Sequence, residues 1–115
     1  MTLDPEAMAR LLDITGGDQG FVDELIDTFI DDATTQIDTL RSAATAADAE
    51  AIVRPAHSLK SNAANVGATA LGELARSLEA DGRTGAVPDV VARVGSIETE
   101  FAAVRDALLA ERAAR

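Results

Sequence analysis

The sequence predicts an all-α protein: an antiparallel four-helix bundle with a short extra N-terminal helix, in a single domain over residues 1–115. Four long segments carry apolar residues at steps of three and four, the spacing of one helix face. No segment has the pattern of a strand. Apolar residues make up 47% of the chain but aromatic residues only 3%. The core must therefore be aliphatic, which favours closely packed helices.

The short first helix is expected at about residues 4–13. Asp4 is a suitable N-cap, and Pro5 fits the first helical position, where its missing N–H would be unpaired anyway. The helix ends at TGGDQG. This sequence lacks the spacing and the lysine of a phosphate-binding loop, so it is interpreted as a helix break.

The second helix is expected at about residues 18–44. Its acidic residues lack the turn glycine and the ligand spacing of a calcium loop, so they are interpreted as a solvated face. The inward stripe consists of Val22, Ile26, Phe29, Ala33, Ile37 and Leu40.

Three more helices are expected at about residues 48–66, 69–80 and 88–112, with DGRTGAVP as a turn between the last two. Pro55 removes a backbone hydrogen bond to Ala51, which predicts a kink or a late helix start around residues 51–55. The inward residues are Ile52, Ala56, Leu59, Ala63 and Val66 in the first of these helices, Leu71, Leu74, Ala75 and Leu78 in the second, and Val91, Val94, Ile97, Phe101, Val104 and Leu108 in the third.

Charge and composition exclude several classes of function. The net charge of −10 argues against binding to nucleic acid or to an acidic membrane surface. Without cysteine there is no disulfide, zinc–thiolate site or cysteine nucleophile. The N-terminus lacks the pattern of a signal peptide, and no apolar run is long enough to span a membrane. We therefore expect a cytoplasmic protein.

His57 is the only histidine, and the helical pattern places it on an exposed flank. It lies about 140° around the helix from the core face, and Lys60 and Ala64 lie on the same side. Residues 51–72 contain no Asp or Glu, where about four would be expected by chance, whereas Arg54 and Lys60 are cations. A neutral imidazole in this setting could attack a phosphoryl group. An incidental surface histidine is the alternative reading.

The sequence AHSLKSNAANVGA, followed by LGELARSLE, resembles the histidine-containing phosphotransfer (HPt) domain family. The family pattern is His-x-Leu-Lys-Gly, then a glycine that ends the helix, then a Leu-rich helix that finishes in Leu-Glu or Leu-Gln. The resemblance implies a helical bundle with His57 as the phosphoacceptor and Lys60 as the residue that neutralises the phosphate. It implies Glu79 as an acceptor for the imidazole Nδ1–H and Gly67 as the helix-ending glycine.

The resemblance also implies a docking surface around His57. Ser61 and Ala64 would be small so that a partner can approach, although Ser61 stands where the family most often has Gly. Arg54 and Asn65 would complete the partner-binding residues. The surface would lie on the exposed flanks of residues 18–44 and 48–66.

The implied function is relay of a phosphoryl group to and from the aspartate of a response-regulator receiver domain, in a two-component phosphorelay. The partners would be that receiver domain and a hybrid sensor histidine kinase, and the chain would be a monomer. It would be no enzyme, and it would hold no cofactor or metal, because Mg²⁺ is expected on the receiver. The phosphoacceptor helices of a sensor kinase are rejected, since Ser58 follows His57 where those helices carry an acid. An adaptor that docks receivers without carrying phosphate remains the alternative.

Overall fold

The computed structural model describes residues 2–113, and these form five helices and no strand. The predicted all-α class and the order of the helices are confirmed. The bounds differ from the prediction by no more than two residues, except at the end of α4. Within the described range, no helix is long and apolar enough to cross a membrane. The helices are α1 (Pro5–Ile14), α2 (Gln19–Thr45), α3 (Ala49–Asn65), α4 (Thr69–Arg83) and α5 (Val90–Ala113).

Aspartate side chains begin the first three helices. Asp4, Asp18 and Asp48 each have an extended backbone and accept a hydrogen bond from an N–H of the first turn, at 3.0 to 3.1 Å. These N–H groups have no partner within the helix, so the carboxylates fix where each helix starts.

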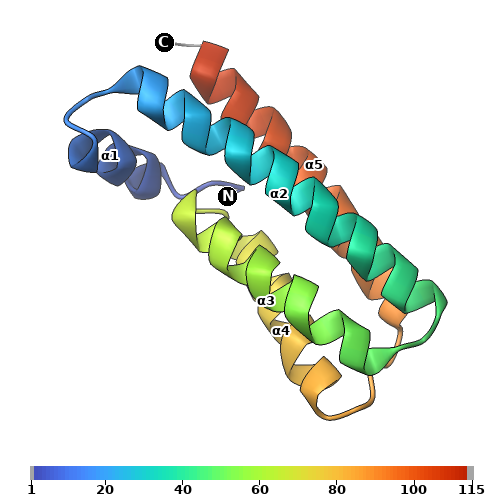
Figure 1. The fold of residues 1–115 in the computed structure, drawn as a ribbon. Helices are drawn as coiled ribbons and strands as arrows, with labels where there is room; N and C mark the ends of the chain where they lie inside the picture. The colour runs from blue at the N-terminus through green and yellow to red at the C-terminus, as the bar shows by residue number, and fades with distance from the viewer. Residues whose placement is uncertain (1, 114–115) are drawn as a thin grey trace.

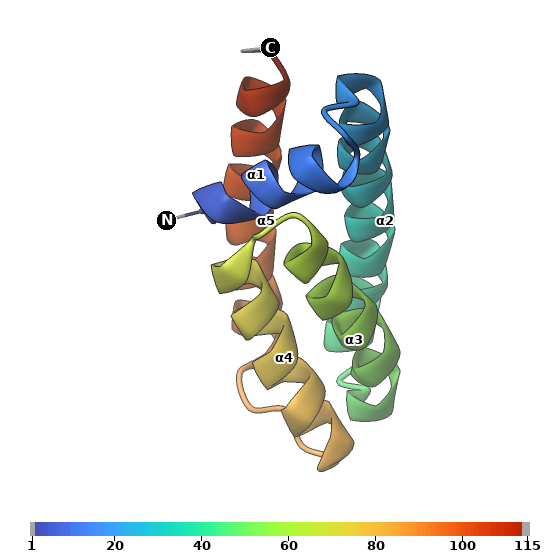
Figure 2. The same cartoon turned by 90° about the vertical axis from the view of Figure 1, so that its left-hand side faces the viewer.

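The four long helices form an antiparallel bundle, and the molecule measures 44 × 22 × 20 Å. The long helices α2 and α5 run side by side, and the shorter hairpin of α3 and α4 packs beside them (Figure 1). The short helix α1 crosses α2 and α5 just beyond the turn between α3 and α4, and both long helices extend past it (Figure 2). The predicted short N-terminal helix is therefore present, and it covers the end of the α3–α4 hairpin.

The core is aliphatic, as predicted, but two predicted core residues lie outside it. Leu74 is 38% exposed and Val91 is 66% exposed. At 100° per residue, Leu74 stands about 60° from Leu71, and Val91 stands about 120° from Ile97. Leu74 and Val91 thus stand about 80° and 100° from the centres of the buried stripes of α4 and α5. The other residues predicted to face inward are all buried.

The turn between α3 and α4 depends on Gly67. Its φ of 71° is the left-handed conformation expected of a helix-ending glycine. The N–H groups of Gly67 and Ala68 donate to the carbonyls of Ala64 and Ala63, at 3.2 and 2.9 Å, which is the Schellman pattern. The N–H of Asp4 donates to the Gly67 carbonyl at 2.8 Å. The same turn thus ends α3 and holds the start of α1.

We expect Gly67→Ala to destabilise the fold by about 2–4 kcal/mol. A Cβ at this position would lie 2.3 Å from the Cβ of Ala7, and the left-handed backbone adds strain. Gly85→Ala is the matched control, because φ at Gly85 is 85° but an added Cβ would meet nothing within 4 Å. It should cost only about 1 kcal/mol. Urea unfolding measures both losses of stability. Equal losses would contradict a close contact between Ala7 of α1 and this turn.

The predicted end of α4 was wrong by three residues, because the helix continues through Asp81, Gly82 and Arg83. Gly82 is buried, and a Cβ there would stand 3.0 Å from Val53 Cγ2 and 3.1 Å from the Ala49 carbonyl. The glycine therefore lets α4 pack closely against the start of α3. This extra turn carries Arg83 into the region of His57.

Candidate functional site

The α3 helix presents His57 despite Pro55. The predicted late start is wrong, because α3 begins at Ala49 and is continuous through the proline. A proline inside a helix costs about 3 kcal/mol. Burial of Pro55, Ile52 and Ala56 between the neighbouring helices offsets this cost. A kink at Pro55 stays a prediction.

The imidazole of His57 is open to solvent on one side and held on the other. Its side chain is 55% exposed, and its Nδ1 lies 2.9 Å from Oε2 of Glu79. Because the carboxylate can only accept, Nδ1 carries the proton and donates it. The neutral ring then has its lone pair on Nε2. Within the described part of the chain, the ring makes no other hydrogen bond.

Glu79 is the only charged residue that is buried among residues 2–113. Its Oε1 lies 2.9 Å from Lys60 Nζ, and its Oε2 lies 2.7 Å from a guanidinium nitrogen of Arg83. Hydrogen bonds from Lys60 and then from Arg83 lower the pKa of Glu79 to about 2, against the smaller opposing effect of its burial. The carboxylate is therefore ionised at neutral pH, and it can compensate a positive charge on the imidazole.

The sequence prediction missed two features of this site. The ion pair between the Lys60 ammonium and Glu79 was not predicted, and the role of Lys60 toward a phosphate stays a prediction. Arg83 was not predicted at all, because the α4 helix was expected to end at residue 80. The signal was present as a glutamate and an arginine four residues apart, at positions 79 and 83, the spacing of a helical ion pair.

The four predicted partner-binding residues all lie exposed on the outer side of α3. Arg54, Ser61, Ala64 and Asn65 are within about 80° of His57 around the helix. Arg54 has no ion pair or hydrogen bond to any side chain that the structure describes. Together with His57 they form a continuous, open helix face.

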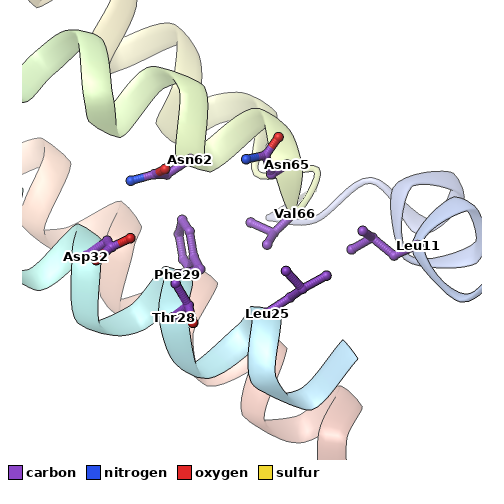
Figure 3. A pocket seen from close by; sticks show the side chains of 8 residues that line it. All are labelled: Leu11, Leu25, Thr28, Phe29, Asp32, Asn62, Asn65 and Val66. Carbon is purple, nitrogen blue, oxygen red and sulfur yellow. The ribbon is translucent and has the colours of Figure 1, made fainter. Parts of the chain in front are cut away.

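An apolar pocket of about 270 Å³ lies between α1, α2 and the end of α3 (Figure 3). On α3 the lining residue nearest to His57 is Asn62, five residues along the helix, or about 7.5 Å at 1.5 Å per residue. Its residues include Asn65, so the pocket adjoins the outer face of α3. Apolar side chains of Leu11, Leu25, Phe29 and Val66 line it, together with the polar Thr28, Asp32, Asn62 and Asn65.

The acidic side chains of α2 do not form a metal centre. Among residues 2–113, no group of three or more His, Asp or Glu side chains is placed to hold a metal ion.

Comparisons with known proteins agree on one family. A family model described as "Hpt domain" matches residues 24–107. The structure is similar to the crystal structure of histidine-containing phosphotransfer protein B (HptB) from Pseudomonas aeruginosa PAO1. The TM-score is 0.90 and the identity is 32%, over 99% of this chain and 96% of that one. A search of curated proteins found no match.

Proposed function

The chain belongs to the Hpt domain family, and from this premise we propose that His57 is the residue that carries the phosphoryl group. The function is histidine phosphotransfer in a two-component phosphorelay, and the protein is a phosphocarrier rather than a classical enzyme. One observation carries the proposal for His57. Its exposed ring is bonded through Nδ1 to a buried, ionised Glu79, which directs the lone pair of Nε2 to solvent.

The chemistry follows from this tautomer. Nε2 attacks the phosphorus of the receiver's aspartyl phosphate, and the N–P bond forms as the bond from phosphorus to the aspartate oxygen breaks. The aspartate leaves with that electron pair as a carboxylate. The proton stays on Nδ1, so the phosphorylated ring is cationic and Glu79 compensates its charge. Transfer back to an aspartate uses the same groups in reverse, and Mg²⁺ is expected on the receiver.

The role proposed for Lys60 is to neutralise the transferred phosphoryl group. Lys60 lies one turn beyond His57 on the same helix, and residues three apart are neighbours on a helix surface. A phosphoryl group on Nε2 offers the ammonium charge-assisted hydrogen bonds. Lys60 would then exchange one anion for another, since it is paired with Glu79 in the unphosphorylated protein.

The partners are a response-regulator receiver domain and a kinase, and the finer proposal is that a hybrid sensor histidine kinase supplies the phosphate. We further propose that the chain neither binds ATP nor phosphorylates itself. A cytoplasmic location and a monomeric state stay predictions from the sequence.

The alternative is an adaptor that docks receivers and carries no phosphate. An adaptor needs no oriented imidazole, so the bond from Nδ1 to a buried carboxylate favours the carrier. The experiment that separates the two is incubation with a phosphorylated receiver domain, with phosphoramidate or with ATP, followed by measurement of the intact mass. An acid-labile gain of one phosphoryl group from the first two donors and none from ATP supports the carrier. No gain from any donor supports the adaptor.

The proposed docking surface comprises the outer face of α3 around His57 and the adjoining flank of α2. Ser61 and Ala64 leave room beside the ring, Arg54 and Asn65 supply polar contacts, and the apolar pocket lies at the edge. Ala64 would form a small apolar centre, with Arg54 and Asn65 on the polar rim that is usual around such an interface.

Ala64→Trp should therefore weaken receiver binding at least tenfold while the fold is unchanged, because the indole would stand in the path of the partner. Ala103→Trp, at an exposed position of α5, is the matched control and should bind as the wild type does. NMR titration with a receiver domain measures both affinity and location. Shifts centred on α5, or a loss of affinity in the control alone, would overturn this surface.

A further inference from the structure

Arg83 occupies a position that none of the roles above explains. Its guanidinium reaches the same Glu79 oxygen, Oε2, that accepts the bond from His57 Nδ1, at 2.7 Å. Lys60 is placed differently, because its ammonium contacts the other oxygen, Oε1. Each cation therefore pairs with a different oxygen of the carboxylate. Arg83 is bonded to the oxygen that orients the ring.

The pairing of Arg83 differs from the other arginine pairing on α4. Arg76 pairs with Glu73, and both of these side chains are 61% exposed. Ion pairs between exposed side chains contribute little to the stability of the fold. Arg83 is also 61% exposed, but its carboxylate partner is only 8% exposed. If a buried carboxylate loses a cationic partner, it remains desolvated but is less well compensated, which costs free energy. Loss of Arg83 should therefore disturb its carboxylate partner more than loss of Arg76.

The proposed function requires Glu79 to keep its position and charge after phosphoryl transfer, when its ion pair with Lys60 is lost. If Lys60 moves to the phosphoryl group, Oε1 of Glu79 loses its partner at the step when the ring becomes cationic. The carboxylate must then stay ionised and stay in place against Nδ1. Arg83 reaches Oε2 from α4, whereas both Lys60 and His57 lie on α3. It can hold Glu79 without following any movement of Lys60.

We propose that Arg83 is a positioning residue, which fixes Glu79 against His57 Nδ1 and so frees Lys60 to exchange between Glu79 and the phosphoryl group. The exchange of Lys60 rests on the proposed function, whereas the positioning of Glu79 does not. Arg83 touches neither the ring nor the phosphate, and it acts through Glu79. Its reach depends on the extra turn of α4, which the close approach at Gly82 allows.

The experiment compares Arg83→Ala, Arg83→Lys and Lys60→Ala, with Arg76→Ala as the matched control. The ¹⁵N chemical shifts of the His57 ring report the tautomer, and rapid-quench measurements report the rate of transfer from a phosphorylated receiver. Arg83→Ala should lose the single Nδ1–H tautomer and slow transfer about tenfold, equivalent to about 1.4 kcal/mol of transition-state stabilisation. Arg83→Lys should restore part of both.

Lys60→Ala should slow transfer but keep the tautomer, and Arg76→Ala should change neither. The proposal is overturned if Arg83→Ala keeps the wild-type tautomer, or if Lys60→Ala is the variant that loses it. The tautomer is measured without phosphate. Failure of the wild type to accept phosphate would therefore overturn the proposed function and leave the positioning role of Arg83 separately tested.

Discussion

His57→Gln should abolish phosphoryl transfer completely. The wild type should gain one acid-labile phosphoryl group from a phosphorylated receiver, and the variant should gain none. The N–P bond of a phosphohistidine needs a ring nitrogen, which glutamine lacks. His57 is also the only histidine in the chain, so no second imidazole could replace it.

The fold of the His57→Gln variant should remain intact. The side chain is 55% exposed and is not part of the hydrophobic core. A glutamine amide can still donate a hydrogen bond to Glu79, so the buried carboxylate keeps a polar neighbour. Thermal unfolding should therefore show a change of less than about 1 kcal/mol. Loss of phosphorylation together with unfolding would leave the role of the ring unproved, and a conservative His57→Asn variant would then be compared.

A phosphoryl group on the His57→Gln variant would contradict the proposal that His57 is the phosphoacceptor. Acid-stable phosphate would indicate a hydroxyl acceptor, and the nearest candidate on the outer face of α3 is Ser61. Stability in acid and base distinguishes the two bonds, since a phosphoramidate is cleaved in acid and a serine ester is not. An adaptor would show the opposite result, with no phosphate on either protein and undiminished binding to the receiver.

The fold could be predicted from the sequence because the signals were local and repeated. Steps of three and four marked the buried stripes, and Asp4 with Pro5 marked the start of the first helix. The errors lie where packing between helices decides. Gly82 was read as part of a turn, yet close contact with α3 keeps it helical. Pro55 was expected to kink α3 or to delay its start, yet α3 starts at Ala49 and is continuous through the buried proline.

The site could be predicted only as far as single residues carry information. The angle of His57 on its helix and the missing acids of residues 51–72 indicated an exposed imidazole beside cations, and the family pattern supplied Glu79. The partner of Lys60 could not be predicted, because the distance between α3 and α4 sets it. Arg83 was missed for the same reason. The charge network around Glu79 is thus a property of the helix pair and not of either segment.

Replacement of Glu79 should have the second largest effect, and two variants separate its charge from its hydrogen bond. Glu79→Ala removes both and should slow transfer by about tenfold to a hundredfold, since a hydrogen bond to a charged group contributes about 1.5–3 kcal/mol. Glu79→Gln keeps an acceptor for Nδ1 but no charge to compensate the cationic ring. It should keep the tautomer and lose part of the rate. Equal rates in Glu79→Ala and the wild type would contradict the proposed role.

The lowered pKa of Glu79 also predicts how the stability of the fold depends on pH. The pKa of Glu79 is about 2 in the folded protein, below its ordinary value of 4.5, so the unfolded chain binds this proton more tightly. The contribution of Glu79 is therefore fully present above about pH 4.5 and lost as the pH falls through about 2. It amounts to roughly 2 kcal/mol once solvent screening around Lys60 and Arg83 is allowed for.

Glu79→Gln should therefore be less stable than the wild type at pH 7, and the difference should shrink between pH 4.5 and pH 2. Urea unfolding of both proteins across that range measures it. The other carboxylates titrate in both proteins, so the difference isolates Glu79. A gap between the two proteins that stays constant from pH 7 to pH 2 would mean that Glu79 acts through its shape and packing. The ionised carboxylate on which the proposed chemistry depends would then be absent.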